Sequence, residues 1–420
     1  MRGPHWARHA MFWHVYPLGF SGAPMDGQPA DPQPRLRRLL DWLDYAVELG
    51  VSGLLLGPVF ASSTHGYDTV DHFAVDPRLG TDQDFDDLVA ACHDKGFTVV
   101  LDGVFSHVGR EHPAFRQVLA DGPDADLASL FDIDWTSEGG PYPQFFEGHE
   151  TLVRLNHSGT QSVDYVVEVM THWLQRGANG WRLDAAYSVP PPFWAKVLPQ
   201  VRAVNPDAWI LGEVIHGDYP RIVTESGMDS LTQYELWKAI WSSLKDENFY
   251  ELDHALDRHN DFLSTFTPNT FIGNHDVTRI ASRLGTHAAT LALSVLMTVG
   301  GIPSIYYGDE RGMTGEKEER PGGDDAVRPQ FPATGAEAAK IGGEQGQRVY
   351  REYQELIGLR RRNDWLVTAR TEALSVQNTH YRYRVRSESG RQYLEVELDL
   401  GNGGSVRIFD AEGNVLWSHG

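Results

Sequence analysis

The sequence predicts an α/β barrel of eight parallel strands, with an inserted segment after the third strand and a small antiparallel β domain at the end. Three observations predict this arrangement. Short apolar runs alternate with amphipathic segments over about 350 residues, as in a chain of strand–helix units. The alternation pauses once, for about fifty residues that show no sustained period. After Trp365, alternating apolar and polar residues are separated by glycine-rich turns, which is typical of antiparallel strands.

The eight expected strands are short buried runs with helical segments between them. Strands that alternate with helices through right-handed crossovers form a parallel sheet covered on both faces, and eight such units close into a (β/α)8, or TIM, barrel. The strands are expected at 11–16, 51–56, 98–101, 180–183, 209–211, 228–231, 270–272 and 302–306. The helical segments are expected at 36–49, 85–93, 162–175, 191–204, 234–266, 288–299 and 348–361.

Domain boundaries follow from the same pattern. We expect the barrel to comprise residues 1–106 and 157–364, the inserted subdomain 107–156, and the C-terminal β domain 365–420. The polar, glycine-rich segment 312–346 is expected to be a mobile loop on the barrel rim.

Composition excludes several classes of partner. The net charge of −22 argues against nucleic acid and anionic membranes, which both need basic patches. The single cysteine, Cys92, lies in a helical pattern and is expected to be a core thiol. The most apolar run, 291–302, is too short to span a membrane. Charged and histidine residues interrupt the first twenty positions, so no signal peptide is expected and the predicted location is cytoplasmic.

The most informative stretch is 179–189, Asn-Gly-Trp-Arg-Leu-Asp-Ala-Ala-Tyr-Ser-Val. Arg182 and Asp184 stand two apart in a buried strand, so both side chains lie on the same face. A buried carboxylate beside a guanidinium is costly unless the pair is fully hydrogen-bonded or used in chemistry. The two interpretations are a structural clamp between strands and a carboxylate presented as a nucleophile.

Further reactive groups follow the other expected strands. Reacting groups in such barrels project from the carboxyl ends of strands. Glu213 ends the fifth strand, His275 and Asp276 follow the seventh, and Asp102 ends the third. Carboxylates that converge raise at least one pKa, which keeps a carboxyl group protonated for acid catalysis near neutral pH.

These segments resemble the conserved regions of the α-amylase family, glycoside hydrolase family 13, in matching order. The segments are 102–107, 180–189, 212–216 and 271–276, with a subsite stretch at 65–76 and an eighth-strand signature at 301–310. The resemblance is nearest to neopullulanase-like, cyclomaltodextrinase-like and other oligosaccharide-acting members. It implies retaining hydrolysis of α-glucosidic, mainly α-1,4, bonds in malto-oligosaccharides or related small α-glucans.

The resemblance also implies roles for individual residues. Asp184 would be the nucleophile, Glu213 the acid and then the base, and Asp276 would hold the sugar hydroxyls at positions 2 and 3. Arg182 would keep Asp184 ionised and oriented. The other expected substrate-binding residues are His65, Tyr67, Asp68, His107, Tyr187, His216 and His275. For His107 and His275, holding the carboxylates is an equally open interpretation, and Asp102 is expected to buttress the site.

Some positions depart from the family pattern. Ser106 stands where many members have an asparagine that helps hold a structural calcium, and serine is a poorer ligand for a hard cation. We therefore expect no metal site there and no required cofactor. Tyr187 and Ile215 differ from neopullulanase-like members on the acceptor side. The aromatic residues on or near the expected rim are Phe60, Phe105, Trp135, Phe145, Phe146 and Tyr187, and a core position is an equally open interpretation for each. Trp135, Phe145 and Phe146 are expected to contact substrate because the insertion has little core to bury them.

Alternatives within and beyond the family stay open. A sugar hydroxyl in place of water would give a transglycosylase, and α-1,6-linked or cyclic glucans are alternative substrates. An inactive carbohydrate-binding homologue would have lost one of Asp184, Glu213 and Asp276, and all three are present. The expected partner is an α-gluco-oligosaccharide. A monomer or weak oligomer is expected, because no N-terminal β-sandwich of the kind found in dimeric relatives precedes the barrel.

Overall fold

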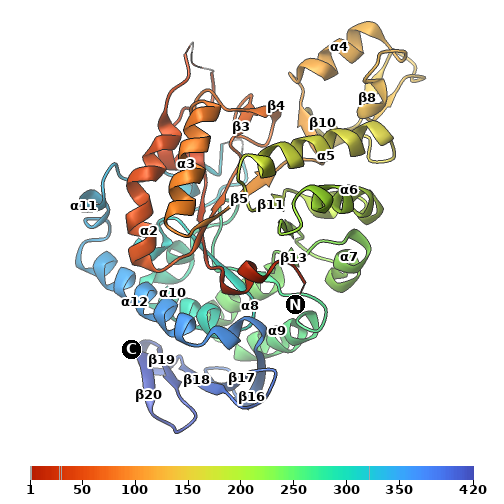
Figure 1. Cartoon of the computed structure of the whole chain (residues 1–420). Coiled ribbons are helices and arrows are strands. Elements are labelled where there is room, and N and C mark those ends of the chain that lie inside the picture. Colours follow the sequence, from red (N-terminus) through yellow and green to blue (C-terminus); the bar gives the residue numbers. More distant parts are fainter. Residues whose placement is uncertain (1, 28, 30, 321) are drawn as a thin grey trace.

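The computed structural model describes residues 2–27, 29, 31–320 and 322–420. Its centre is a parallel sheet in the order β13-β12-β11-β5-β2-β1-β15-β14, and a parallel bridge between Thr232 and Asn269 links the two ends. This confirms the predicted (β/α)8 barrel (Figure 1). The strands are β1 (Phe12–Val15), β2 (Gly53–Leu56), β5 (Thr98–Gly103), β11 (Gly180–Leu183), β12 (Trp209–Gly212), β13 (Ser230–Leu231), β14 (Asn269–Thr270) and β15 (Ile302–Tyr306).

The seventh strand is shorter than predicted. We expected it at 270–272, but β14 ends at Thr270. Phe271 is buried and packs edge-on against the ring of Tyr234, with ring centres 5.0 Å apart. The side chain therefore contributes to the core although its backbone has left the sheet, which an apolar run alone does not reveal.

Helices cover the barrel on its outside (Figure 1). Their starts follow local chemistry; for example, Thr81 and Asp84 form a reciprocal capping box at the start of α3. The helices are α1 (Pro17–Ser21), α2 (Leu43–Leu49), α3 (Asp82–Asp94), α5 (Thr160–Gln175), α6 (Pro191–Val204), α7 (Tyr219–Ser226), α8 (Tyr234–Lys245), α9 (Phe249–Phe262), α10 (Ile280–Thr298), α11 (Gly335–Ala338) and α12 (Gly343–Arg362).

Helix α10 is long and apolar enough to cross a membrane by length and composition alone. Its 291–298 portion is wholly buried in the main core, where α10 packs against α8 and α12. Gly285, with φ 73°, interrupts the helix near its start. These features are those of a core helix.

The inserted segment forms a small unit with its own core. It contains β6 (His107–Gly109), α4 (Pro113–Asp121), β7 (Ile133–Asp134), β8 (Tyr142–Pro143), β9 (Phe145–Phe146) and β10 (His149–Arg154). Phe115, Phe131 and Val153 are buried at its centre. Trp135 and Phe145 pack against this centre, so the expectation that the insertion has little core to bury them is wrong.

Two other aromatic residues take the core position that the sequence left open as the alternative to the rim. Phe60 and Phe105 are 1% and 0% exposed and belong to the main core rather than the rim. Phe146 lies flat against the ring of His107, with ring centres 4.5 Å apart.

The C-terminal β domain is a five-stranded antiparallel sheet. Its strands are β16 (Arg370–Val376), β17 (His380–Arg386), β18 (Tyr393–Asp399), β19 (Ser405–Phe409) and β20 (Val415–His419), paired in sequence order. Alternate residues such as Tyr383, Val396 and Ile408 are buried in the main core. Figure 1 shows this sheet beneath the barrel, beside α9 and α12.

The described part of segment 312–346 contacts the barrel through buried residues, and its expected mobility stays a prediction. Val327 and Phe331 are buried at 0% and 1% exposure. The hydroxyls of Tyr306 and Tyr307 donate to the carbonyls of Val327 and Pro329 at 2.8 and 2.7 Å. The composition of the segment did not reveal these apolar anchors.

Candidate active site

Arg182 is the centre of a buried charged cluster at the carboxyl ends of β5, β11 and β12. Its Nη1 lies 2.5 Å from Asp102 Oδ2 and 3.2 Å from Asp184 Oδ1, and its Nη2 lies 2.7 Å from Glu213 Oε1. The sheet register accounts for the first contact, because Arg182 stands opposite Asp102 in the β11–β5 pairing. One guanidinium therefore contacts three carboxylates, so Arg182 acts as a clamp between strand ends. The other interpretation, that Asp184 is a nucleophile, stays a prediction.

Glu213 is held by neutral donors as well as by Arg182. The backbone N–H of Ala185 donates to Oε2 at 3.0 Å, and the hydroxyl of Tyr234 donates to Oε1 at 3.0 Å. Ala185 has φ 44° and ψ 38°, a left-handed conformation that is unfavourable for a residue with a Cβ. This strained residue directly follows Asp184 in the sequence, and its N–H donates to Glu213.

Asp276 joins the cluster through side chains that the sequence did not single out. Asn274 donates to the hydroxyl of Tyr234 at 2.8 Å and accepts from the backbone N–H of Asp276 at 2.9 Å. Tyr234 thus links Glu213 to the loop that carries Asp276. The Asp276 side chain is 31% exposed, compared with 12% for Asp184.

Arg328 was also missed and fixes Asp276 from segment 312–346. Its Nη2 lies 2.9 Å from Asp276 Oδ1, and its Nε donates to the carbonyl of His275 at 2.9 Å. The guanidinium carbon lies 4.8 Å from the ring centre of Tyr16, and the side chain is 7% exposed. An arginine in a polar, glycine-rich segment gives no signal of this kind, because its partner stands far away in the sequence.

Three aromatic rings stack beside these groups. The ring of His275 lies between those of Tyr16 and Tyr67, with ring centres 5.9 and 5.4 Å away and planes within 4° and 3° of parallel. The Tyr67 hydroxyl contacts His275 Nε2 and donates to Asp102 at 3.0 Å. His275 is 0% exposed, which supports its interpretation as a residue that holds others in place.

The remaining predicted residues divide into supports and rim residues. Both oxygens of Asp68 accept hydrogen bonds from Thr64, and both ring nitrogens of His107 are occupied, one by Ser106 at 2.7 Å and one by the carbonyl of Tyr67 at 2.9 Å. Asp68 and His107 therefore hold the loop that carries Tyr67. The rim residues are His65, Tyr187 and His216, of which His216 is exposed and Tyr187 donates to Glu147 in the insertion at 2.9 Å.

Burial dominates the protonation of the carboxyl groups. It raises the pKa of Asp184 well above 3.8, with a further rise from the charge of Glu213 and an opposing effect of Arg182. Burial likewise raises the pKa of Asp102 to about 6. Arg182 acts in the direction that favours the ionised form of Asp184, and burial opposes it more strongly.

Acidification is expected to reduce the contribution of His107 to stability. Burial lowers the pKa of His107 from 6.5 to about 4, so the folded state binds fewer protons than the unfolded state between these values. The contribution of neutral His107 to the free energy of unfolding is fully present above pH 6.5. It is lost as the pH falls towards 4, at about 1.4 kcal/mol per pH unit. Urea unfolding of wild type and His107→Gln should show a stability difference about 2 kcal/mol smaller at pH 5 than at pH 7. An unchanged difference would contradict a neutral buried imidazole.

Loss of Arg328 is expected to impair catalysis more than folding. Arg328→Gln removes the charge that holds Asp276, and a misplaced catalytic group costs on the order of 100-fold in rate. We expect kcat/KM on an oligosaccharide substrate to fall by about 10- to 100-fold. The protein should still fold, because Asp276 and Asp324, the carboxylates left without Arg328, are each 31% exposed and can be solvated. The matched control is Arg320→Gln in the same segment, whose side chain is 61% exposed. Equal activity of the two variants would show that Arg328 does not position Asp276.

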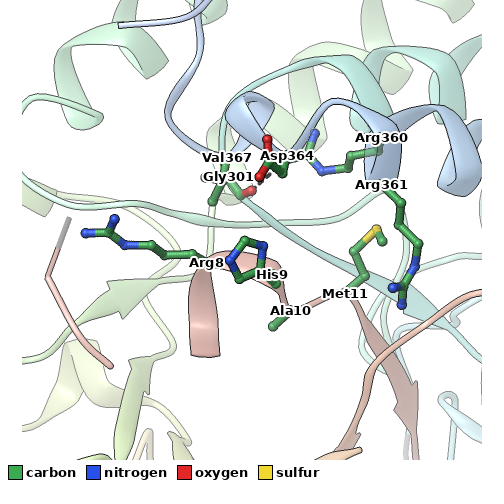
Figure 2. A pocket seen from close by; sticks show the side chains of 9 residues that line it. All are labelled: Arg8, His9, Ala10, Met11, Gly301, Arg360, Arg361, Asp364 and Val367. Atoms are coloured by element: carbon green, nitrogen blue, oxygen red, sulfur yellow. Dashed lines mark hydrogen bonds between the residues drawn. The ribbon is translucent and has the colours of Figure 1, made fainter. Parts of the chain in front are cut away.

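The described residues contain no group of three or more His, Cys, Asp or Glu side chains arranged to hold a metal ion. A cavity of about 100 Å³ lies at the opposite end of the barrel, beside the residues that precede β1 and β15 (Figure 2). Its lining includes Arg8, His9, Arg360 and Arg361. The guanidinium of Arg360 donates hydrogen bonds to the backbone carbonyls of Met297, Val299 and Gly301. The acidic cluster is therefore separate from this basic end.

The chain is an α/β barrel with acidic side chains gathered at the carboxyl ends of its strands, the end at which such barrels carry their active sites. The family model described as alpha amylase, catalytic domain, matches residues 14–341. The chain belongs to the alpha-amylase family, as the conserved segments predicted.

Relatives of known name agree with this assignment. Neopullulanase 2 of Thermoactinomyces vulgaris is 32% identical over 388 residues, which is 86% of this chain and 64% of that protein. A cyclomaltodextrinase of Thermoanaerobacter pseudethanolicus is 30% identical over 390 residues, 86% of this chain and 65% of that protein. The chain thus spans less than two thirds of the length of these relatives.

Solved structures show the same fold. A structure titled cyclomaltodextrinase has a TM-score of 0.81 and 26% identity, and the match covers 95% of this chain and 71% of that one. The ligand-free cyclic α-maltosyl-(1→6)-maltose hydrolase from Arthrobacter globiformis has a TM-score of 0.83 at 24% identity, with 98% of each chain covered. The second likeness establishes the fold alone.

Proposed function

We propose that this protein is a retaining glycoside hydrolase that cleaves α-glucosidic, mainly α-1,4, bonds in malto-oligosaccharides or related small α-glucans. The observation that carries the proposal is the double contact of Arg182 with Asp184 and Glu213 at adjoining strand ends. Two carboxyl groups about 5–5.5 Å apart suit a mechanism with a covalent glycosyl-enzyme.

In the proposed reaction Glu213 is the acid and Asp184 is the nucleophile. Glu213 donates a proton to the glycosidic oxygen while Asp184 attacks the anomeric carbon, so the leaving sugar departs with a new hydroxyl. Glu213 then takes a proton from water, which attacks the same carbon and releases Asp184 with overall retention. Asp276, fixed by Arg328, would bind sugar hydroxyls and favour the distorted ring of the transition state. The mechanism requires no cofactor.

The names of the relatives suggest which substrates to test first. Cyclodextrins and pullulan follow from the cyclomaltodextrinase and neopullulanase 2 matches. Hydrolysis of α-1,6-linked or cyclic glucans and transglycosylation are the alternatives within this proposal. A cytoplasmic monomer or weak oligomer stays our prediction; a relative named intracellular maltogenic amylase, from Bacillus subtilis, is 26% identical over 345 residues.

The test is an activity panel with stereochemical analysis. Release of reducing sugar is measured on maltotriose, pullulan, cyclodextrins and trehalose, and proton NMR follows the first-formed anomer. We expect α-configured products from at least one α-1,4-linked substrate, and chain-lengthened products at high substrate concentration would identify transglycosylation. Products of β configuration, or no turnover on any of these sugars, would overturn the proposal.

A further inference from the structure

Two imidazole rings face each other where the C-terminal sheet meets helix α10. His287 Nδ1 lies 2.9 Å from His419 Nε2, and the ring centres are 4.4 Å apart. The first residue belongs to α10 and the second to β20, so the pair bridges two domains. The His287 side chain is exposed to solvent. The ring of His419 lies parallel to that of Trp417.

The outward nitrogen of each ring contacts a group that can only accept a hydrogen bond. His287 Nε2 lies 2.8 Å from the carbonyl oxygen of Gly404, and His419 Nδ1 lies 2.8 Å from Glu352 Oε1. The other oxygen of Glu352 accepts from Thr290 at 2.7 Å, which fixes the carboxylate. Each neutral imidazole therefore carries its proton on the outward nitrogen. Both inward nitrogens then present lone pairs to each other.

Two lone pairs at 2.9 Å repel unless a proton or a cation lies between them. In a straight N–H···N bond of this length, the ring centres would be about 5 Å apart, because each nitrogen lies about 1 Å from its ring centre. The observed 4.4 Å shows that the rings are bent towards a common side. Two nitrogens each 2.0–2.1 Å from one metal ion, at a right angle, are about 2.9 Å apart, which matches the measured separation.

We propose that His287 and His419 form a binding site for a divalent transition-metal ion of the nickel or copper class, whose neighbouring ligands stand at right angles. The proposal is independent of the glycosidase function. Glu352 and the Gly404 carbonyl serve as the outer partners that orient metal-bound histidines. The described residues bring no third His, Cys, Asp or Glu into a metal-binding group here, so water from the exposed side of His287 completes the coordination shell. A bound ion ties β20 to α10.

The experiment uses tag-free full-length protein and Ni²⁺ as the probe. His5 and His9, whose ring centres are 5.6 Å apart, form another imidazole pair and are replaced by alanine in every protein tested. Isothermal titration calorimetry in this background should show one Ni²⁺ bound per chain, and thermal unfolding should shift upwards in excess Ni²⁺. His287→Ala and His419→Ala should each abolish both effects. Glu352→Gln should weaken binding by about 10- to 100-fold.

The chain offers a matched control in the same β domain. His380 Nε2 lies 3.0 Å from Glu397 Oε1, which reproduces the His419–Glu352 contact without a facing imidazole. His380→Ala and Glu397→Gln should leave Ni²⁺ binding unchanged. If the background protein binds Ni²⁺ no better than His287→Ala/His419→Ala, or if His380→Ala loses binding equally, the pair is only hydrogen-bonded and the proposal is overturned.

Discussion

Asp184→Asn is expected to lower kcat by about 10⁴-fold or more on any natural substrate of this protein. The amide side chain cannot form the covalent bond to the anomeric carbon, and the proposed mechanism has no other side chain that serves as the nucleophile. Folding should persist, because asparagine keeps the shape of the side chain and Asp184 makes a single contact of 3.2 Å with Arg182. Steady-state kinetics with circular dichroism and thermal unfolding measure both expectations.

Glu213→Gln distinguishes the roles of the two carboxyl groups. Protonation of the leaving oxygen matters for a sugar leaving group but little for an aryl glycoside whose phenol leaves without help. Glu213→Gln should therefore form the glycosyl-enzyme from an aryl maltoside at a rate close to that of wild type, whereas Asp184→Asn should not. Wild-type activity in Asp184→Asn, or the reverse pattern between the two variants, would contradict the assignment.

Arg182→Met is expected to destabilise the protein by about 3–5 kcal/mol, because removing one partner of a buried ion pair strands the other. The guanidinium is 4% exposed and contacts Asp102, Asp184 and Glu213, so its removal leaves three carboxyl groups without a buried positive charge. Urea unfolding at pH 7 measures the loss. Adding Asp102→Asn, which removes one of the stranded charges, should recover part of it.

Arg176→Met provides the comparison for this prediction. Arg176 also contacts two carboxylates, those of Asp82 and Asp86, but these side chains are 42% and 41% exposed. Solvent screens such pairs, so a loss of at most about 1 kcal/mol is expected. Similar losses in Arg176→Met and Arg182→Met would mean that burial of the Arg182 cluster has no special energetic consequence.

The barrel and the acidic residues were predictable because their signals are local. Buried runs such as 180–183 are continuous in the sequence, and strand ends in a parallel barrel necessarily meet at one edge. The positions of Asp184, Glu213 and Asp276 therefore followed from strand order. The family resemblance added roles to residues whose place was already indicated.

Arg328, Tyr234 and the burial of Phe60 could not be predicted in the same way. Each depends on a contact between segments far apart in the chain, which the local sequence pattern does not indicate. The proton balance of Asp184 was also beyond the sequence, because the sign of its pKa change depends on how burial compares with the charge of Arg182. The core of the insertion was missed because its apolar residues are spread over short, irregular elements.

Because Arg328 contacts Asp276, the proposed active site is built from the barrel together with segment 312–346, which lies later in the chain. Segment 312–346 follows the last barrel strand, so the eight strands can pair before the Arg328–Asp276 contact forms. A local opening that breaks only the Arg328–Asp276 contact would leave the eight strands paired, but Asp276 would no longer be held in place for the substrate. The rate of turnover should therefore report loss of the Arg328–Asp276 contact more sensitively than a spectroscopic signal from the barrel.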